Sequence, residues 1–192
     1  EEEAGLLGDL RDAVVLEIGA GAAQCSRWLH SHGVKVVASD LSGQMLAAGD
    51  AANRTYGVEV PLVQADARAL PFANASFDVT FTSYGAIPFV PDAIRIHQEA
   101  HRVLRPGGRW VFSVTHPIRW AFPDDPGERG LTAQRSYFDR RPYVELAAHE
   151  HITYAEYHRT LGDHIRDLTA AGFTVRDVVE PEWTPGRATW GG

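Results

Sequence analysis

The chain has 192 residues, which is enough for one domain with a substantial core, and its 44% hydrophobic and 22% charged content is ordinary for a globular protein. No apolar run approaches the roughly 20 residues that cross a bilayer, so no membrane partner is predicted. A formal net charge of −7 argues against a nucleic-acid partner, because phosphate backbones repel a negatively charged protein. With Cys25 as the single cysteine and no signal-peptide pattern at the start, the sequence predicts a soluble, cytoplasmic protein of undetermined oligomeric state.

Short runs rich in Val, Ile and Phe alternate with longer segments of helical period. This alternation predicts an α/β fold, with a doubly wound, mostly parallel sheet and helices on both faces. The predicted strands are residues 13–18, 34–39, 58–64, 77–82, 109–115 and 173–179. The predicted helices are residues 22–32, 42–56, 92–104 and 160–171. We expect a single domain over residues 1–192, in which the irregular stretch 117–152 forms a lid or substrate-binding insertion.

Two glycines lie between the first predicted strand and the helix after it. Gly19 and Gly21 leave this turn without side chains, so that a ligand can approach the backbone closely. Asp40 follows 19 residues after Gly21, the spacing expected of a carboxylate that accepts hydrogen bonds from ribose hydroxyls. Nicotinamide and flavin dinucleotides use similar turns, but the glycine that their fingerprint places three residues after Gly21 is Gln24 here. These residues predict an adenosine-containing cofactor and weaken the case for a pyrophosphate.

Further motifs follow in a characteristic order along the chain. They are VVLEIGAG at residues 14–21, QADA at 64–67, LPF at 70–72, SFD at 76–78 and EAHRVLRPGG at 99–108. Together they resemble the class I S-adenosylmethionine-dependent methyltransferase family, in particular its small-molecule branch, over roughly residues 14–117. The resemblance implies a Rossmann-like methyltransferase fold with S-adenosyl-L-methionine as cofactor.

The chain departs from the family pattern at two places. The third glycine of the family's loop corresponds to Ala23, a small residue that helix geometry tolerates. Six strands are visible, but nothing after Glu180 predicts a seventh strand that would complete a hairpin with the sixth. We therefore expect an incomplete or unusual end to the sheet, with an edge that a partner or loop would cover.

The resemblance implies a role for ten residues in cofactor binding. Glu17, Gly19, Ala20 and Gly21 would lie near its amino-acid end, Asp40 at the ribose, Leu41, Met45, Asp66 and Ala67 around the adenine, and Ser83 beside the reactive methyl. Asp66 would accept a hydrogen bond from the exocyclic amine.

Catalytic residues are harder to predict, because an in-line methyl transfer gains much of its rate from positioning and from the exclusion of water. A hydroxyl or protonated amine acceptor also needs a base, and His116 at the end of the fifth predicted strand is the candidate. A structural role, in which His116 caps the strand end, is the alternative. Tyr84 is the second catalytic candidate, with a packing role as its alternative. The predicted substrate-binding residues are Tyr84, His116, Trp120, Tyr157 and His158, and no metal site is predicted.

Three functions remain open at this point. The leading prediction is S-adenosylmethionine-dependent methyl transfer to O, N or C of a small molecule. The second is a nicotinamide-dependent oxidoreductase on a similar fold, against which Gln24 and the Asp66-Ala67 pair argue. The third is a non-catalytic S-adenosylmethionine-binding protein, which the incomplete sheet edge favours.

Overall fold

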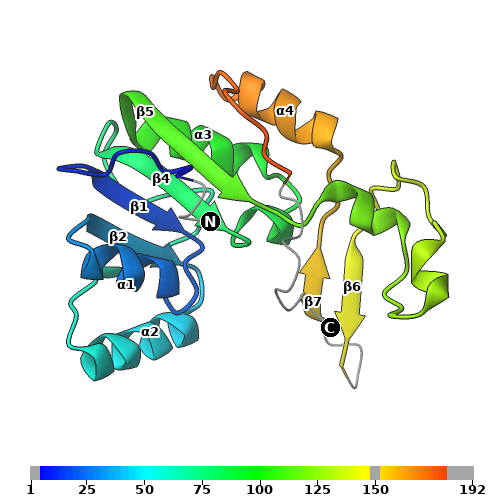
Figure 1. Cartoon of the computed structure of the whole chain (residues 1–192), viewed down its shortest axis with the longest axis horizontal. Helices are drawn as coiled ribbons and strands as arrows, with labels where there is room; N and C mark the ends of the chain where they lie inside the picture. The colour runs from blue at the N-terminus through cyan, green and yellow to red at the C-terminus, as the bar shows by residue number, and fades with distance from the viewer. Residues whose placement is uncertain (1–4, 148–151, 181–192) are drawn as a thin grey trace.

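The computed structural model describes residues 5–147 and 152–180. Five parallel strands form one sheet in the order β3-β2-β1-β4-β5 (Figure 1). A separate antiparallel hairpin, β6-β7, projects beside it. The strands are β1 (Val14–Ile18), β2 (Lys35–Asp40), β3 (Leu62–Gln64), β4 (Phe77–Ser83), β5 (Leu104–Ser113), β6 (Tyr143–Leu146) and β7 (Ile152–Glu156). The hydrogen-bonded sheet is thus entirely parallel, as expected of a doubly wound fold.

Three helices lie between strands of the sheet, namely α1 (Gln24–Ser31), α2 (Gly43–Tyr56) and α3 (Ile94–Val103), and the short 3-10 turn η2 (Ile87–Phe89) precedes α3. The 3-10 turns η3 (Pro117–Ala121) and η4 (Glu128–Leu131) follow β5, and α4 (Leu161–Ala170) follows β7. Local capping sets several of the helix ends. The Ser42 hydroxyl accepts a hydrogen bond from the Met45 N–H at the start of α2, and Gly57 ends that helix in the left-handed conformation. Thr160 and Asp163 form a capping box at the start of α4.

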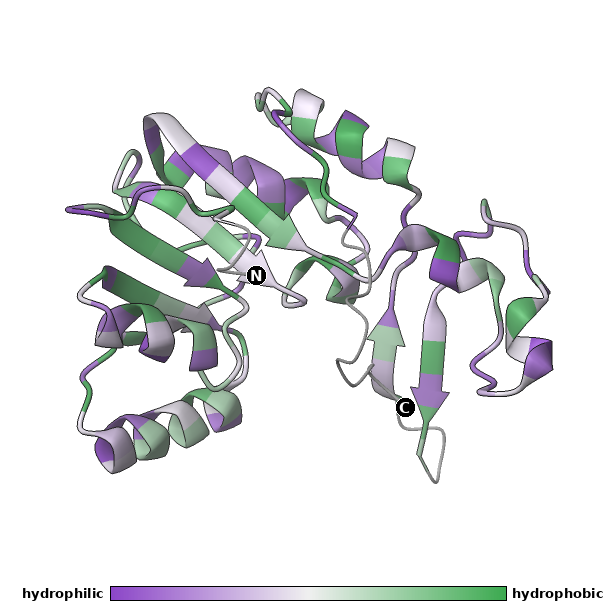
Figure 2. Ribbon diagram, in the orientation of Figure 1, coloured by the Kyte–Doolittle hydropathy of each residue, from purple (hydrophilic) through white to green (hydrophobic). Residues whose placement is uncertain are grey.

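The core lies on both faces of the sheet. On one face, Val15 of β1 belongs to a cluster that includes Leu29 of α1. On the other face, Leu16 and Ile18 pack in a cluster with Val103 of α3, and α4 lies against α3. Figure 2 shows β1 as a largely hydrophobic strand, in agreement with its central place in the sheet. Burial on both faces explains why this strand carries consecutive apolar side chains.

The strand order changes direction beside β1. From β1 the chain proceeds outward through β2 to β3, and it then crosses over to β4 on the other side of β1. Ligands of open α/β sheets bind at such a switch point, outside the carboxyl ends of the strands. The fold therefore directs attention to the loops that follow β1, β2 and β4.

The structure corrects three details of the predicted elements. The sixth strand predicted at residues 173–179 is wrong, because residues 173–180 contain no strand: Val175, Val178 and Val179 are exposed and no ladder forms there. A strand needs a hydrogen-bonded partner as well as apolar residues. The stretch 117–152 is less irregular than expected, since β6 lies within it and pairs with β7. In addition, β3 begins only at Leu62 and β5 already at Leu104.

Two further predictions concern a seventh strand and a membrane-crossing segment. A seventh strand after Glu180 would fall beyond the described residues. No helix in the described ranges has both the length and the apolar character needed to cross a bilayer.

Candidate functional site

A cavity of about 470 Å³ lies at the carboxyl ends of the strands around the switch point. Gly19 and Gly21 line it after β1, Asp40 at the end of β2, and Asp66 after β3. All ten residues predicted to bind the cofactor line this cavity except Met45. Met45 lies close by, since its terminal methyl would be 3.3 Å from a Cβ added to Gly21. The structure thus brings both predicted carboxylates to one cavity beside the glycine turn.

The glycine turn leaves no room for side chains. Gly19 has a φ of +68°, and a Cβ at this position would lie 2.6 Å from the backbone nitrogen of Ala86. A Cβ on Gly85 would in turn lie 2.5 Å from the carbonyl oxygen of Gly19. The loops after β1 and β4 therefore pack backbone against backbone. Glycine is therefore required at Gly19 and Gly85 for these two loops to pack at the edge of the cavity.

Ala23 occupies an unexpected backbone conformation. Its φ of 59° and ψ of 39° place it in the left-handed region at the N-cap of α1. This conformation costs a non-glycine residue roughly 1–2 kcal/mol. A glycine would adopt it without strain, whereas the sequence had indicated only that helix geometry tolerates an alanine there.

Asp40 ties the glycine turn to the end of β2. One carboxylate oxygen accepts a hydrogen bond from the Gly21 N–H at 2.7 Å, and the other accepts from the Ser42 N–H at 2.8 Å. A carboxylate offers about four acceptor positions, so both oxygens keep capacity for hydroxyl donors. Asp40 can therefore accept the hydrogen bonds that hold the turn and bind the hydroxyl groups of a ligand at the same time.

Asp66 is held by a neighbouring arginine. Arg68 donates to it from the backbone at 2.9 Å and from Nη2 at 2.8 Å, and Nη1 reaches Asp92 at 3.4 Å. The hydrogen bonds from Arg68 lower the pKa of Asp66, so its carboxylate is ionised near neutral pH. A ligand donor must share this carboxylate with Arg68.

Glu17 is buried at the end of β1. Its carboxylate accepts hydrogen bonds from the backbone and the hydroxyl of Ser26, which connects β1 to α1. Burial raises the pKa of Glu17 to about 7, and the bonds from Ser26 only partly oppose this effect. Because Glu17 lines the cavity, a cation bound there would favour its ionised form.

Tyr84 follows β4 with a strained backbone. Its φ of 51° lies in the left-handed region, and its N–H donates to the Ser113 carbonyl at 3.0 Å. Tyr84 and Ser83 both line the cavity. Such strain in a residue with a Cβ is frequently found at functional sites.

His116 lies outside the large cavity. Its Nδ1 accepts from the Ile118 N–H at 3.2 Å and thereby caps η3, while its Nε2 lies 2.5 Å from a carboxylate oxygen of Glu180. His116 does not belong to the lining of the large cavity. The structure therefore separates it from the residues predicted to bind the cofactor, while its neighbours Thr115 and Pro117 line a second cavity.

A second, smaller cavity of about 30 Å³ contains two of the predicted substrate-binding residues, Trp120 and Tyr157. His158 is buried beside it, with its ring centroid 5.9 Å from that of Trp120 and its Nε2 2.7 Å from the Tyr137 carbonyl oxygen. Two further lining residues, Arg159 and His164, were not predicted. The helix start at Thr160 was the available signal for them, since both residues lie within a few positions of it.

No group of three or more His, Cys, Asp or Glu side chains is placed to hold a metal ion within residues 5–147 and 152–180.

The domain can now be compared with known proteins. A family model described as a methyltransferase domain matches residues 15–108, which contain the glycine turn, Asp40 and Asp66. Over these residues the chain resembles the class I methyltransferase family. Its parallel sheet and helices have the Rossmann-like arrangement of that family.

Two curated relatives illustrate the similarity. Over 104 residues the chain is 39% identical to a malonyl-[acyl-carrier protein] O-methyltransferase from Enterobacter lignolyticus, covering 54% of this chain and 39% of that protein. Over 139 residues it is 41% identical to a demethylmenaquinone methyltransferase from Mycolicibacterium vanbaalenii, covering 69% of this chain and 58% of that protein. The chain thus spans about half the length of the curated relatives that it matches.

Solved structures agree over a larger part of the chain. An S-adenosylmethionine-dependent methyltransferase from Mesorhizobium loti superposes with a TM-score of 0.65 and 27% identity, covering 91% of this chain and 80% of that one. A structure from Listeria monocytogenes gives a TM-score of 0.77 at 25% identity, covering 96% and 84%. The similarity therefore extends beyond the residues that the family model matches.

Proposed function

We propose that this protein binds S-adenosyl-L-methionine and transfers its methyl group to a small-molecule acceptor. The observation that carries the proposal is the cavity that the Gly19–Gly21 turn, Asp40 and Asp66 share at the switch point of the sheet. The match of residues 15–108 to the methyltransferase domain and the cofactor named for the similar structure from Mesorhizobium loti support the same assignment.

The lining of the cavity suits this cofactor. Asp40 keeps acceptor capacity for ribose hydroxyls, and the turn at Gly19 and Gly21 presents its backbone to the part of the cavity that an amino-acid tail would occupy. Glu17 offers a buried carboxylate to an ammonium group near that turn. Asp66, with Leu41 and Ala67 near it in the lining, would contact the adenine. When bound, the cofactor supplies an electrophilic methyl group on a sulfonium.

The residues of the chain then have to position the acceptor and exclude water. Ser83 and Tyr84 border the cavity at the end of β4. Tyr84 is better placed than His116 to contact an acceptor there, because His116 does not line this cavity. A role for His116 as base requires its ring to leave Ile118 and Glu180, so its present contacts favour a capping role. We assign the lid and acceptor contacts to residues 117–152 and to Trp120, Tyr157 and His158 beside the small cavity.

Calorimetric titration with S-adenosylhomocysteine tests the proposal. Asp40→Asn removes the charged acceptor for ribose, and a hydrogen bond to a charged group contributes about 1.5–3 kcal/mol. We therefore expect at least tenfold weaker binding by this variant. Asp50→Asn is the matched control, because Asp50 pairs with Arg54 on the exposed side of α2, away from the cavity.

Two results would contradict the proposal. Tighter binding of NADH than of S-adenosylhomocysteine would support an oxidoreductase, and equal binding by Asp40→Asn and Asp50→Asn would remove Asp40 from the site. Cofactor binding without methyl transfer to a broad panel of hydroxyl, amine and carbon acceptors would reduce the assignment to a binding protein.

A further inference from the structure

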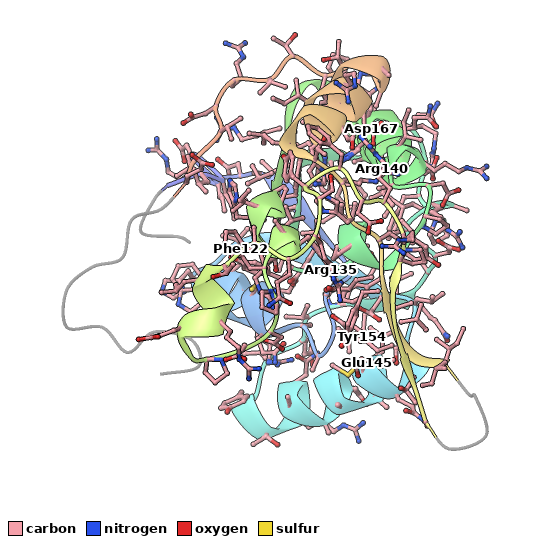
Figure 3. The ribbon with its side chains drawn as sticks, turned by 90° about the vertical axis from the view of Figure 1, so that its right-hand side faces the viewer. Phe122, Arg135, Arg140, Glu145, Tyr154 and Asp167 are labelled. Carbon is pink, nitrogen blue, oxygen red and sulfur yellow. The ribbon has the colours of Figure 1, made fainter. Side chains whose placement is uncertain are left out.

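The small cavity lies next to the proposed cofactor cavity. Ile87 and Pro88 of η2 line the small cavity, whereas Ala86 and Phe89 line the large one. Its other walls come from the end of β5, from η3, from the residues after β7 and from α4. Figure 3 views this side of the molecule, with Tyr154 labelled on β7 and Asp167 on α4. Much of the wall is apolar, formed by Ile87, Pro88, Val114, Pro117 and Trp120.

Two of the residues that line this cavity each have a buried polar atom with no partner among the described residues. His164 is only 7% exposed and its Nδ1 makes no hydrogen bond. The Nε of Arg159 is also buried and unpartnered. Leaving a buried polar atom unpaired costs roughly 1–3 kcal/mol, so native proteins seldom do so without a water or ligand. These two atoms therefore point to a binding site for a polar group.

The remaining contacts of Arg159 hold it in place. Its Nη1 donates to Asp167 at 2.5 Å, and its Nη2 donates to the Pro91 carbonyl oxygen at 2.9 Å. The guanidinium is thus fixed between α4 and the loop before α3, with its Nε–H as an unused donor. A ligand gains a preorganised hydrogen bond from this group.

His164 supplies the complementary function. Burial, with the nearby charge of Arg159 as a second cause, lowers the pKa of His164 to about 4. The ring is then neutral at pH 7, with one nitrogen as donor and one as acceptor. A cationic neighbour favours a lone pair over an N–H on the nitrogen that faces it. The site therefore combines one donor with one acceptor.

The surrounding charges select against ions. Glu156 also lines the cavity, and its carboxylate is engaged by the Tyr154 hydroxyl. An anion would be repelled by Glu156, and an ammonium group has no lone pair with which to accept from the Nε–H of Arg159. An uncharged hydroxyl avoids both penalties, because its oxygen accepts from Arg159 and its O–H donates to His164. A cavity of about 30 Å³ is also the size of one such group.

We propose that the small cavity recognises the uncharged hydroxyl of an alcohol or phenol whose apolar body extends out of the cavity past η2 and Trp120. The proposal rests on the proposed function in one respect, namely that the molecule so recognised is the methyl acceptor. The hydroxyl serves as a recognition handle, and the methylated atom can be this oxygen or another atom of the same molecule.

Titration with small aromatic probes tests the proposal. Phenol should bind to the protein, both alone and saturated with S-adenosylhomocysteine. Anisole lacks the donor and benzoate carries a charge, so both should bind at least tenfold more weakly, as sites built to pair a hydroxyl reject analogues without one. Affinity can be measured by calorimetry, and ¹⁵N spectra of labelled histidine should show the Nδ1 signal of His164 moving on phenol addition.

Variants identify the two recognising groups. His164→Leu and Arg159→Met should each weaken phenol binding at least tenfold and leave the affinity for S-adenosylhomocysteine unchanged. The matched controls are His101→Leu on the exposed side of α3 and Arg166→Met, which changes an exposed arginine that pairs with Asp163. Arg159→Met leaves Asp167 without its partner, so if that variant does not fold, His164→Leu alone decides the question.

Several outcomes would overturn the proposal. They are equal affinity for phenol, anisole and benzoate, unchanged phenol binding by His164→Leu, and no phenol binding at all, which would mean that the cavity holds only water. Failure of the proposed function is distinguishable, because the protein would then bind phenol at this cavity but not S-adenosylhomocysteine.

Discussion

The parallel sheet and the β6-β7 hairpin differ in what holds them in place. In the sheet, Leu16 and Ile18 of β1 are completely buried in the cluster that includes Val103 of α3. In the hairpin, every residue of β6 is exposed, and Leu146 has 60% of its surface accessible. Hydrophobic burial therefore fixes the position of the sheet residues, whereas the hairpin depends mainly on its own backbone pairing.

The polar contacts show the same contrast. Asp40 joins two loops that are distant in the sequence, and Glu17 joins a strand to a helix. In the region after β5, the ion pairs Arg141–Asp139 and Arg129–Asp125 connect near neighbours in the chain, and Arg140–Asp163 attaches the region to α4. Local pairs constrain a loop but do not attach it to the core. The part of the molecule that surrounds the proposed cofactor is thus the more rigidly defined, and the part that would choose the acceptor has more freedom to vary.

The largest predicted effect tests this contrast by removing matched side chains from the two regions. Leu16→Ala should lower the free energy of unfolding by about 2–5 kcal/mol, because it leaves a cavity in a packed core. Leu146→Ala should change it by less than about 0.5 kcal/mol. Urea denaturation followed by circular dichroism measures both. Similar losses for the two variants would mean that the hairpin packs as tightly as the sheet.

A second prediction concerns the pH dependence of the core beside α4. Burial lowers the pKa of His97 to about 4, and its Nδ1 accepts from the Trp110 indole at 3.0 Å. Between pH 6.5 and 4 the unfolded chain binds a proton at this residue and the folded protein does not. His97 therefore lowers stability as the pH falls through this range, by up to about 3 kcal/mol.

His97→Gln keeps a hydrogen-bond acceptor but does not titrate. The wild-type protein should thus lose more stability than this variant when urea denaturation is compared at pH 6.5 and pH 4. Taking the difference between the two proteins removes the contribution of Glu17, whose raised pKa acts in the opposite direction. Parallel stability curves would contradict the prediction.

The smallest predicted effect lies at the glycine turn. Ala23→Gly relieves the left-handed backbone strain but loses a buried methyl and makes the unfolded chain more flexible. These contributions oppose each other, so the free energy of unfolding should change by less than about 1 kcal/mol. Thermal denaturation measures the change. A loss above 2 kcal/mol would show that the methyl of Ala23 contributes more to packing than its strained backbone costs.

The sequence was most informative where both faces of a strand are buried. Residues 14–18 and 77–83 were predicted almost to their ends, because continuous apolar runs have few alternative places in a folded protein. The glycine spacing and Asp40 located the large cavity for a similar reason, since the position of a side-chain-free turn is fixed by the strand before it.

The missed features depend on contacts between distant residues. Residues 173–179 have the composition of a strand, but only the folded structure reveals that no strand of the described residues pairs with them. The hairpin was hidden by exposed residues without a strong alternating pattern. Arg159 and His164 became site candidates only when folding left one atom of each unpaired at the same cavity.

The turn η2 has a consequence for how acceptor preference can change. Of the five positions in and beside this turn, Ala86, Phe89 and Val90 line the large cavity, and Ile87 and Pro88 line the small one. Because this turn forms a wall of both cavities, a substitution that enlarges one cavity also shifts a wall of the other. Evolution toward bulkier acceptors would therefore be expected to adjust methyl-donor affinity at the same time, and engineering that aims to keep the two independent should begin at Trp120, which contributes to the small cavity only.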